Sequence, residues 1–112
     1  MNHSELSLWA LSPLDGRYFE KVNNLRSFLS EGALNCYRIK VELLWTLHLL
    51  EAMKEKKFPQ LVDNLDECLL SIRKLSQESY YKDINRVKKI EKTIRHDVKS
   101  CEYFIQDLIK QN

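Results

Sequence analysis

The sequence predicts an all-α protein, and three observations lead to that fold class. Two glycines and two prolines in 112 residues leave few breaks, so long elements are expected. Apolar residues recur at steps of three and four, the spacing of one helix face, and no strand-length alternation occurs. A composition of 44% hydrophobic and 30% charged residues is that of a globular domain. We expect a single helical domain over 1–112, with an N-terminal loop and about five helices.

The N-terminal part is expected to begin as a loop. Residues 1–11 are mixed, and Ser12-Pro13-Leu14-Asp15-Gly16 is a turn signal, because proline presets one dihedral angle and Asp-Gly tolerates a tight return. Helical periodicity follows on one side, at Val22, Leu25, Phe28 and Leu29. Ser30 and Gly32 indicate a break or a new start.

The next stretch predicts the longest helix. One face carries Leu34, Tyr37, Val41, Leu44, Trp45, His48 and Ala52. Further leucines at 43, 47 and 50 widen that face, so we expect the helix to be buried on much of its circumference. It should end near the charged run 54–57, before Pro59. On this reading His48 is a core histidine, and Trp45 and Tyr37 are core or interface residues.

Three more helical segments are expected after Pro59. The first carries Leu61, Leu65, Cys68, Leu69, Ile72 and Leu75, and the polar residues 76–79 end it. The second carries Ile84, Val87, Ile90 and Ile94. The third carries Val98, Cys101, Phe104 or Ile105, and Leu108.

The junction between the last two segments is open to two readings. Thr93 and Asp97 both resemble capping residues, and Asp97 could cap a helix that starts at Val98. We favour an interruption from Thr93 to His96, which would turn backbone N–H groups and a positive helix end toward an anionic ligand. The alternative is one continuous helix with His96 and Asp97 on its polar face.

Charge and cysteine content exclude several classes of protein. The net charge of +2 is too small to indicate a nucleic-acid partner. Between Lys82 and Lys99 there are seven basic and three acidic residues, most simply a solvated basic face. Cys36, Cys68 and Cys101 form no CxxC pair and are expected to be reduced, in a cytoplasmic protein without a disulfide frame or metal site. No apolar stretch is long enough for a membrane span.

Two clusters carry residue types suited to chemistry. Arg17-Tyr18 follows the predicted turn, and a guanidinium and a phenol on a loop suit recognition of phosphate or carboxylate. Arg95-His96-Asp97 joins a permanent cation, a group that titrates near neutral pH and a carboxylate that could orient the imidazole. Taken alone, each cluster is better explained as solvated surface.

Together the clusters resemble the adenylosuccinate lyase family. The resemblance lies in the stretches SPLDGRY from Ser12 to Tyr18, YRIKVE from Tyr37 to Glu42, and IEKTIRHDVKSCEYF from Ile90 to Phe104. It covers essentially the whole chain. SPLDGRY and HDVKxxEYF are specific when they are found together.

The resemblance implies a fold, an activity and a set of site residues. Members of this family eliminate fumarate from adenylosuccinate to give AMP, and from the succinyl carboxamide intermediate of purine synthesis, without a metal or organic cofactor. Arg17 and Tyr18 would contact the nucleotide. Arg95, His96 and Asp97 would line the same site, with His96 orienting the substrate or supporting proton transfer. Position 95 varies in the family, so the backbone there is expected to matter more than the side chain.

The resemblance also implies what this chain lacks. The family's Gly-Ser-Ser-x-Met-Pro loop with its catalytic serine, its main catalytic histidine, its central helical bundle and its C-terminal domain have no counterpart in the sequence. We therefore expect an N-terminal portion of a homotetrameric enzyme, inactive alone. The alternative is a stand-alone helical interaction module that binds a protein or a nucleic acid.

Overall fold

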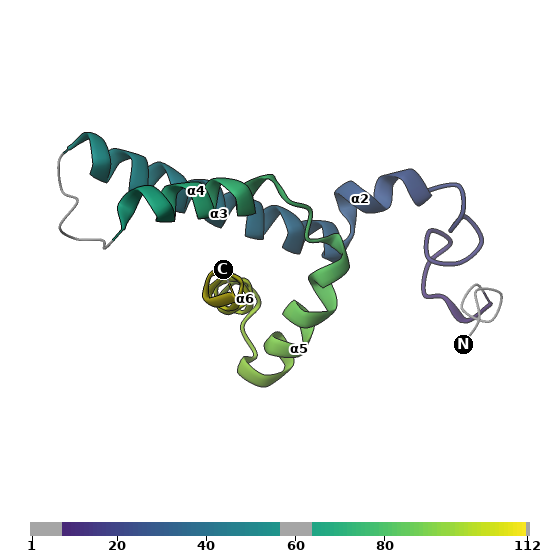
Figure 1. The fold of residues 1–112 in the computed structure, drawn as a ribbon. Helices are drawn as coiled ribbons and strands as arrows, with labels where there is room; N and C mark the ends of the chain where they lie inside the picture. Colours follow the sequence, from purple (N-terminus) through teal and green to yellow (C-terminus); the bar gives the residue numbers. More distant parts are fainter. Residues whose placement is uncertain (1–7, 57–63, 112) are drawn as a thin grey trace. The chain divides into compact units, whose positions relative to one another are not determined.

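The structure, a computed structural model, describes residues 8–56 and 64–111 and is mostly helical (Figure 1). Within these ranges it holds five α-helices and no strand: α2 (Arg26–Leu29), α3 (Glu31–Glu55), α4 (Leu65–Gln77), α5 (Ile84–Ile94) and α6 (Asp97–Gln111). Two short 3-10 helices, η1 (Asn23–Leu25) and η3 (Tyr81–Asp83), precede α2 and α5. The predicted all-α class is confirmed.

The chain divides into two compact units, Met1–Leu34 and Asn35–Asn112. The expectation of a single domain over 1–112 stays a prediction.

The first unit is built around the turn that the sequence predicts. The N–H groups of Asp15 and Gly16 donate to the carbonyl of Ser12 at 3.1 and 3.2 Å. The N–H of Tyr18 then donates to the carbonyl of Pro13 at 2.8 Å. These bonds close the backbone on itself and leave Tyr18 at the surface, so the turn prediction is confirmed.

The break at Ser30 is also confirmed, and its hydroxyl explains why α3 begins there. Ser30 has extended dihedral angles (φ −79°, ψ 162°) that end α2. Its Oγ accepts the N–H of Ala33 at 3.0 Å, the bond that a serine N-cap makes to the first turn of a helix. The preceding helix is short, because only η1 and the four residues of α2 are helical.

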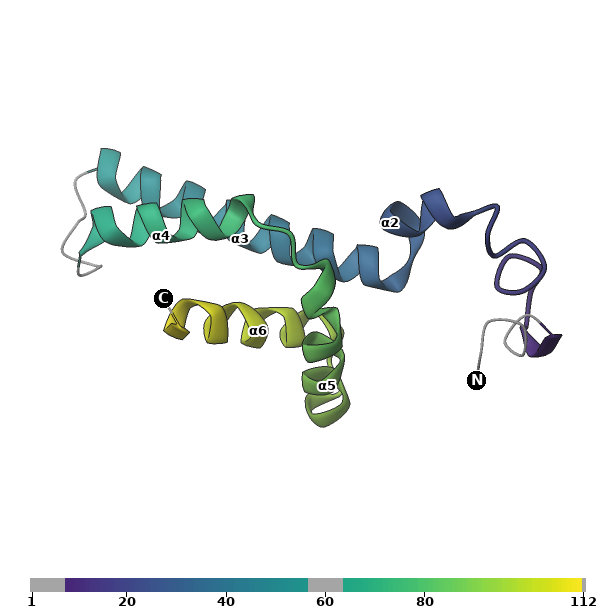
Figure 2. The same cartoon turned by 45° about the vertical axis from the view of Figure 1, so that its right-hand side comes forward.

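The core of the second unit lies between four helices. Figures 1 and 2 show α3 and α4 side by side, and Figure 1 shows α6 end-on below them, so α6 crosses the pair at a steep angle. Ion pairs from Lys54 to Asp66 (2.7 Å) and from Arg73 to Glu51 (2.8 Å) join α3 to α4. Each helix contributes apolar side chains to one buried cluster, in chain order Ile39, Leu43, Ile72, Leu75, Tyr80, Val87, Cys101, Phe104 and Ile105.

The structure corrects the predicted burial of α3. Its buried face is formed by Asn35, Ile39 and Leu43, with Leu47 and Leu50 partly buried beside them. The face that the sequence suggested as the core is exposed: Leu34, Tyr37, Val41, Leu44, Trp45 and His48. Apolar residues surround this helix, so periodicity alone could not say which side would find a partner. His48 stacks on Trp45 at 6.0 Å between ring centroids and is no core histidine.

The remaining boundaries follow the predicted order. α4 begins at Leu65, after Asn64 in the left-handed region (φ 54°). The predicted start at Pro59 and the apolar Leu61 lie outside the described residues. Among the helices that the structure describes, none combines the length and apolar character that a membrane crossing needs.

Candidate functional site

The chain breaks between α5 and α6 at Arg95 and His96, inside the interruption that the sequence favoured from Thr93 to His96, while Thr93 and Ile94 still belong to α5. α5 ends at Ile94, α6 starts at Asp97, and Arg95 adopts the left-handed region (φ 56°, ψ 38°). The N–H of Arg95 still donates to the carbonyl of Glu91 at 2.6 Å, so α5 is closed before the chain turns. The alternative prediction of one continuous helix through this region is therefore wrong.

His96, and not Asp97, caps α6. The N–H of Lys99 donates to His96 Nδ1 at 3.1 Å, and the N–H of Ser100 donates to the His96 carbonyl at 3.1 Å. These are the two bonds of an N-cap residue, with the imidazole nitrogen replacing the usual side-chain oxygen. Asp97 is the first helical residue, and its Oδ1 accepts the N–H of Val98 at 2.8 Å. The expectation that Asp97 caps a helix beginning at Val98 is corrected by one residue.

The cap determines which hydrogen bond His96 can offer to a ligand. Because Nδ1 accepts the Lys99 N–H, a neutral imidazole carries its proton on Nε2, which is then a donor. The side chain is 63% exposed, so it remains accessible. The nearest oxygen of Asp97 lies 4.0 Å from Nδ1, beyond hydrogen-bond distance. The backbone of α6 therefore orients the ring, where the sequence suggested a carboxylate.

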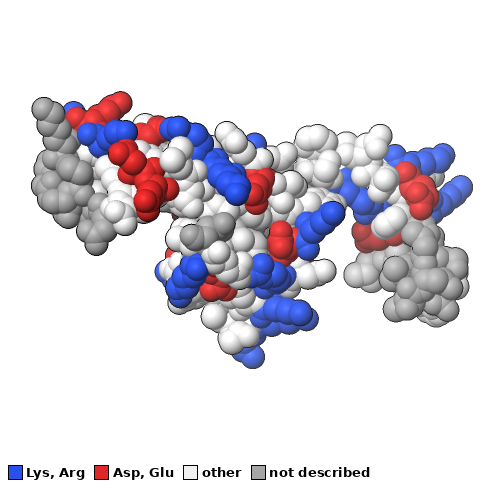
Figure 3. Space-filling model, in the orientation of Figure 1, with Lys and Arg blue, Asp and Glu red and all other residues white. Residues whose placement is uncertain are grey.

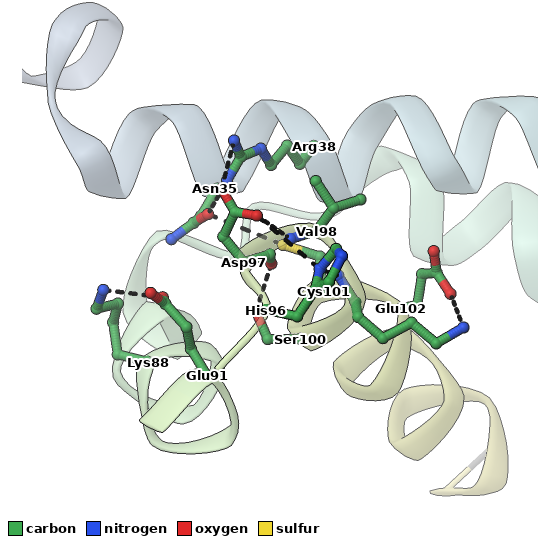
Figure 4. A network of polar contacts seen from close by, with 11 residues as sticks. Asn35, Arg38, Lys88, Glu91, His96, Asp97, Val98, Ser100, Cys101 and Glu102 are labelled. Atoms are coloured by element: carbon green, nitrogen blue, oxygen red, sulfur yellow. Dashed lines mark hydrogen bonds and ion pairs between the residues drawn. The ribbon is translucent and has the colours of Figure 1, made fainter. Parts of the chain in front are cut away.

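A polar network holds Asp97 against α3 (Figure 4). Arg38 Nη2 lies 3.1 Å from Asp97 Oδ2, while its Nη1 donates to Asn35 Oδ1 at 3.2 Å. The pKa of Asp97 lies below its usual range, first because of the Val98 N–H and then because of the Arg38 cation. The carboxylate is thus ionised and fixed from two sides.

The network continues into the core at Cys101. Burial raises the pKa of the Cys101 thiol, so its S–H is retained and donates to Asn35 Oδ1 at 3.9 Å. Both residues are fully buried. All three cysteines are free. The described residues contain no group of three His, Cys, Asp or Glu side chains placed to hold a metal ion.

A shallow hollow of about 580 Å³ opens at the break between the helices. Its lining is formed by Glu91, Lys92, Arg95, His96 and Asp97. Figure 3 shows basic side chains, with acidic ones among them, over this part of the second unit. Two cations and one N–H donor beside two carboxylates suit a polar ligand that carries anionic groups.

The other predicted cluster lies in the first unit. Arg17 and Tyr18 are exposed, with the Arg17 guanidinium carbon 5.4 Å from the centre of the Tyr18 ring. Lys21 Nζ lies 5.7 Å from the same centre. Two cations around one phenol suit recognition of a phosphate. The convergence of this cluster with His96 stays a prediction.

Sequence reasoning missed three basic residues at these two places. Lys21 follows Arg17 by four positions, and Lys92 precedes His96 by four, so spacing was a usable signal for both. Arg38 stood in one of the family-like stretches, but nothing in the sequence indicated that it would reach Asp97, fifty-nine positions later.

Comparison with known proteins agrees with the family-like stretches. The chain is 38% identical over 104 residues to adenylosuccinate lyase of Haemophilus influenzae, covering 93% of this chain and 22% of that protein. The Escherichia coli enzyme is 37% identical over 106 residues, and that of Dictyostelium discoideum is 36% identical over 101. The chain therefore spans about a fifth of the length of these relatives. No family model matches it.

Proposed function

We propose that this chain, which belongs to the adenylosuccinate lyase family, forms the part of a lyase active site that binds and orients the substrate. The reaction would be elimination of fumarate from adenylosuccinate to give AMP, and from the succinyl carboxamide intermediate of purine synthesis. The observation that carries the proposal is the helix break at residues 95–96, where His96 and Arg95 stand beside the hollow.

The chemistry of the elimination matches what this break offers. Removing a proton beside a carboxylate builds up negative charge on that carboxylate, so cations and hydrogen-bond donors there lower the barrier. His96 offers Nε2–H as a donor, because Nδ1 already accepts the Lys99 N–H. This assigns to His96 the orientation of the substrate rather than abstraction of its proton. Arg95 and Asp97 would line the same site.

The nucleotide end of the substrate would be bound by the first unit. Arg17 and Tyr18 would contact its phosphate, with Lys21 as a further cation beside the ring. The 112 residues alone are proposed to be inactive. A fumarate elimination needs both a general acid and a general base. In a neutral His96, Nδ1 accepts the Lys99 N–H and Nε2 holds its proton as a hydrogen-bond donor, so this side chain supplies neither group. The homotetramer, the cytoplasmic location and the absence of a cofactor remain predictions.

The second reading, a stand-alone interaction module, is not supported by the comparisons. The similarity to lyases extends over more than nine-tenths of the chain. The basic residues of the hollow are accompanied by the carboxylates of Glu91 and Asp97, which do not suit a nucleic-acid surface.

The proposal can be tested by a chimera in which residues 1–112 replace the corresponding segment of the Escherichia coli relative. Cleavage of adenylosuccinate is then followed by absorbance. The chimera should be active, and His96→Ala should lower kcat/KM roughly a hundredfold, the scale of a lost donor to a developing oxyanion. The matched control is His48→Ala, which removes an exposed histidine from α3 in the same unit and should leave the rate unchanged.

Two results would contradict the proposal. A folded chimera without activity, prepared beside an active parent enzyme, would remove the lyase function from this chain. Equal rates for the His96→Ala and His48→Ala chimeras would remove His96 from the site.

A further inference from the structure

The contact between α3 and the first turn of α6 carries a further inference. Arg38 lies one turn after Asn35 on α3, and both side chains face the start of α6 (Figure 4). The two terminal nitrogens of Arg38 have different partners, Asn35 Oδ1 at 3.2 Å and Asp97 Oδ2 at 3.1 Å. The guanidinium therefore links a residue of the core to a residue of the candidate site.

The core end of this link is fixed. Asn35 is 1% exposed, and its Oδ1 accepts from both Arg38 and the buried thiol of Cys101. A buried amide with two donors on one oxygen has little freedom to rotate. Arg38 is consequently held in one position on α3.

The site end is fixed as well. Every acceptor of Asp97 is engaged: Oδ1 by the Val98 N–H, Oδ2 by Arg38, and the carbonyl by the Ser100 hydroxyl. Asp97 directly follows His96, so a displacement of its carboxylate would move the cap on which the imidazole orientation depends.

The Arg38 end of this ion pair is more shielded from solvent than its Asp97 end. The Arg38 side chain is 27% exposed and that of Asp97 53%, against 60% and 78% for Lys54 and Asp66. Exposed pairs contribute little, because solvent screens them and long side chains lose entropy in forming them. A planar guanidinium that is already held by a second acceptor loses less freedom on binding a carboxylate.

We infer that Arg38 is a positioning residue: anchored by Asn35, it holds Asp97 and so keeps His96 in the orientation that presents Nε2–H to the substrate. The inference rests on the proposed function for its consequence in catalysis. Its structural half, the control of the imidazole by a residue on α3, does not depend on that function.

The first arm of the test uses NMR on the 112-residue chain. The nitrogen shifts of His96 report which ring nitrogen carries the proton, and amide exchange of Lys99 reports the cap. Arg38→Gln should shift the His96 nitrogens toward an even mixture of tautomers and speed Lys99 exchange about tenfold, the scale of one lost charge-assisted hydrogen bond. The matched control is Arg73→Gln, which removes the pair with Glu51 and should leave both signals unchanged.

The second arm uses the chimera described above. Arg38→Gln should lower kcat/KM about tenfold, mainly through kcat, because a misplaced donor weakens the transition state more than the ground state. Arg38→Lys keeps the charge but cannot reach both acceptors, so it should recover only part of the loss. If Arg38→Gln lost its helical circular dichroism, the Lys variant would carry the comparison.

The possible outcomes distinguish a failure of the inference about Arg38 from a failure of the proposed lyase function. Unchanged His96 and Lys99 signals in Arg38→Gln would overturn the inference, and so would an unchanged kcat/KM in an active chimera. An inactive chimera before any substitution would instead overturn the proposed function, and the NMR arm would still decide the role of Arg38.

Discussion

Replacing Arg95 by glycine should stabilise this protein, although glycine usually weakens helical segments. Arg95 adopts φ 56° and ψ 38°, in the left-handed region, directly after the last residue of α5. The Cβ of any L-residue other than glycine crowds the following carbonyl there. At this position a side chain is thus a source of strain.

The size of the effect follows from two opposing terms. The left-handed conformation costs a non-glycine residue about 1–2 kcal/mol. Glycine loses more backbone entropy on folding, which offsets about 0.5–1 kcal/mol of that gain. The net stabilisation should be about 0.5–1 kcal/mol, equivalent to a rise of about 2–6 °C in Tm for a domain of this size. Arg95→Asn should do as well, because asparagine tolerates this region with less entropy to lose.

Thermal unfolding followed by circular dichroism measures the change. The matched control is Lys92→Gly, three positions earlier, exposed and within α5, which should be destabilised by about 1 kcal/mol. Opposite signs at the two positions would tie the effect to the backbone conformation. Asn64 also adopts the left-handed region, which asparagine already tolerates, so Asn64→Ala should lower the Tm.

A lower Tm for both Arg95→Gly and Arg95→Asn would refute this reasoning, because it would mean that the guanidinium contributes more than the strain removes. The same variants bear on function. If the backbone at position 95 matters more than its side chain, Arg95→Asn in the chimera should keep most of the activity.

Two further predictions concern pH. Burial first, and then the charges of Glu78 and Asp83, raise the pKa of Tyr80 from 10 to about 12. The stability that this raised pKa contributes is therefore full below pH 10 and is lost as the pH rises toward 12. Tyr80→Phe removes the 2.6 Å bond to the Leu75 carbonyl and should cost about 1 kcal/mol. Comparing urea unfolding of the two proteins across this pH range measures the contribution of Tyr80 to the free energy of unfolding. The pKa of Asp97 is lowered from 3.8, so the contribution of Asp97 to stability should be present above that pH and be lost only as the pH falls below it. An NMR titration of the Asp97 carboxyl group should show a lower midpoint than that of a free aspartate.

The sequence anticipated the local features that nearby residues decide. The turn at residues 12–16 and the break at Ser30 form where their turn and capping residues stand. The interruption before Asp97 was also anticipated, since capping residues cluster there. The choice of cap was missed, because His96 is not among the residue types that usually cap a helix, and only the geometry shows its Nδ1 accepting a backbone N–H.

The burial of α3 shows where local reasoning ends. Its apolar residues surround the helix, and the side that packs is chosen by α4, α5 and α6, whose positions depend on the rest of the chain. The face around Trp45 remains exposed, and His48 with it. A pattern states which residues share a face; it contains no information on which face has a partner.

The sequence by itself determined the all-α class, the order of the helices, the break that carries His96 and the family-like stretches. Each of these depends on residues within a few positions of one another, whose dihedral preferences and capping bonds act locally. Only the tertiary structure decided that Arg38 reaches Asp97 and that Asn35 and Cys101 anchor it. Those contacts join α3 to α6 across the core, and packing brings them together.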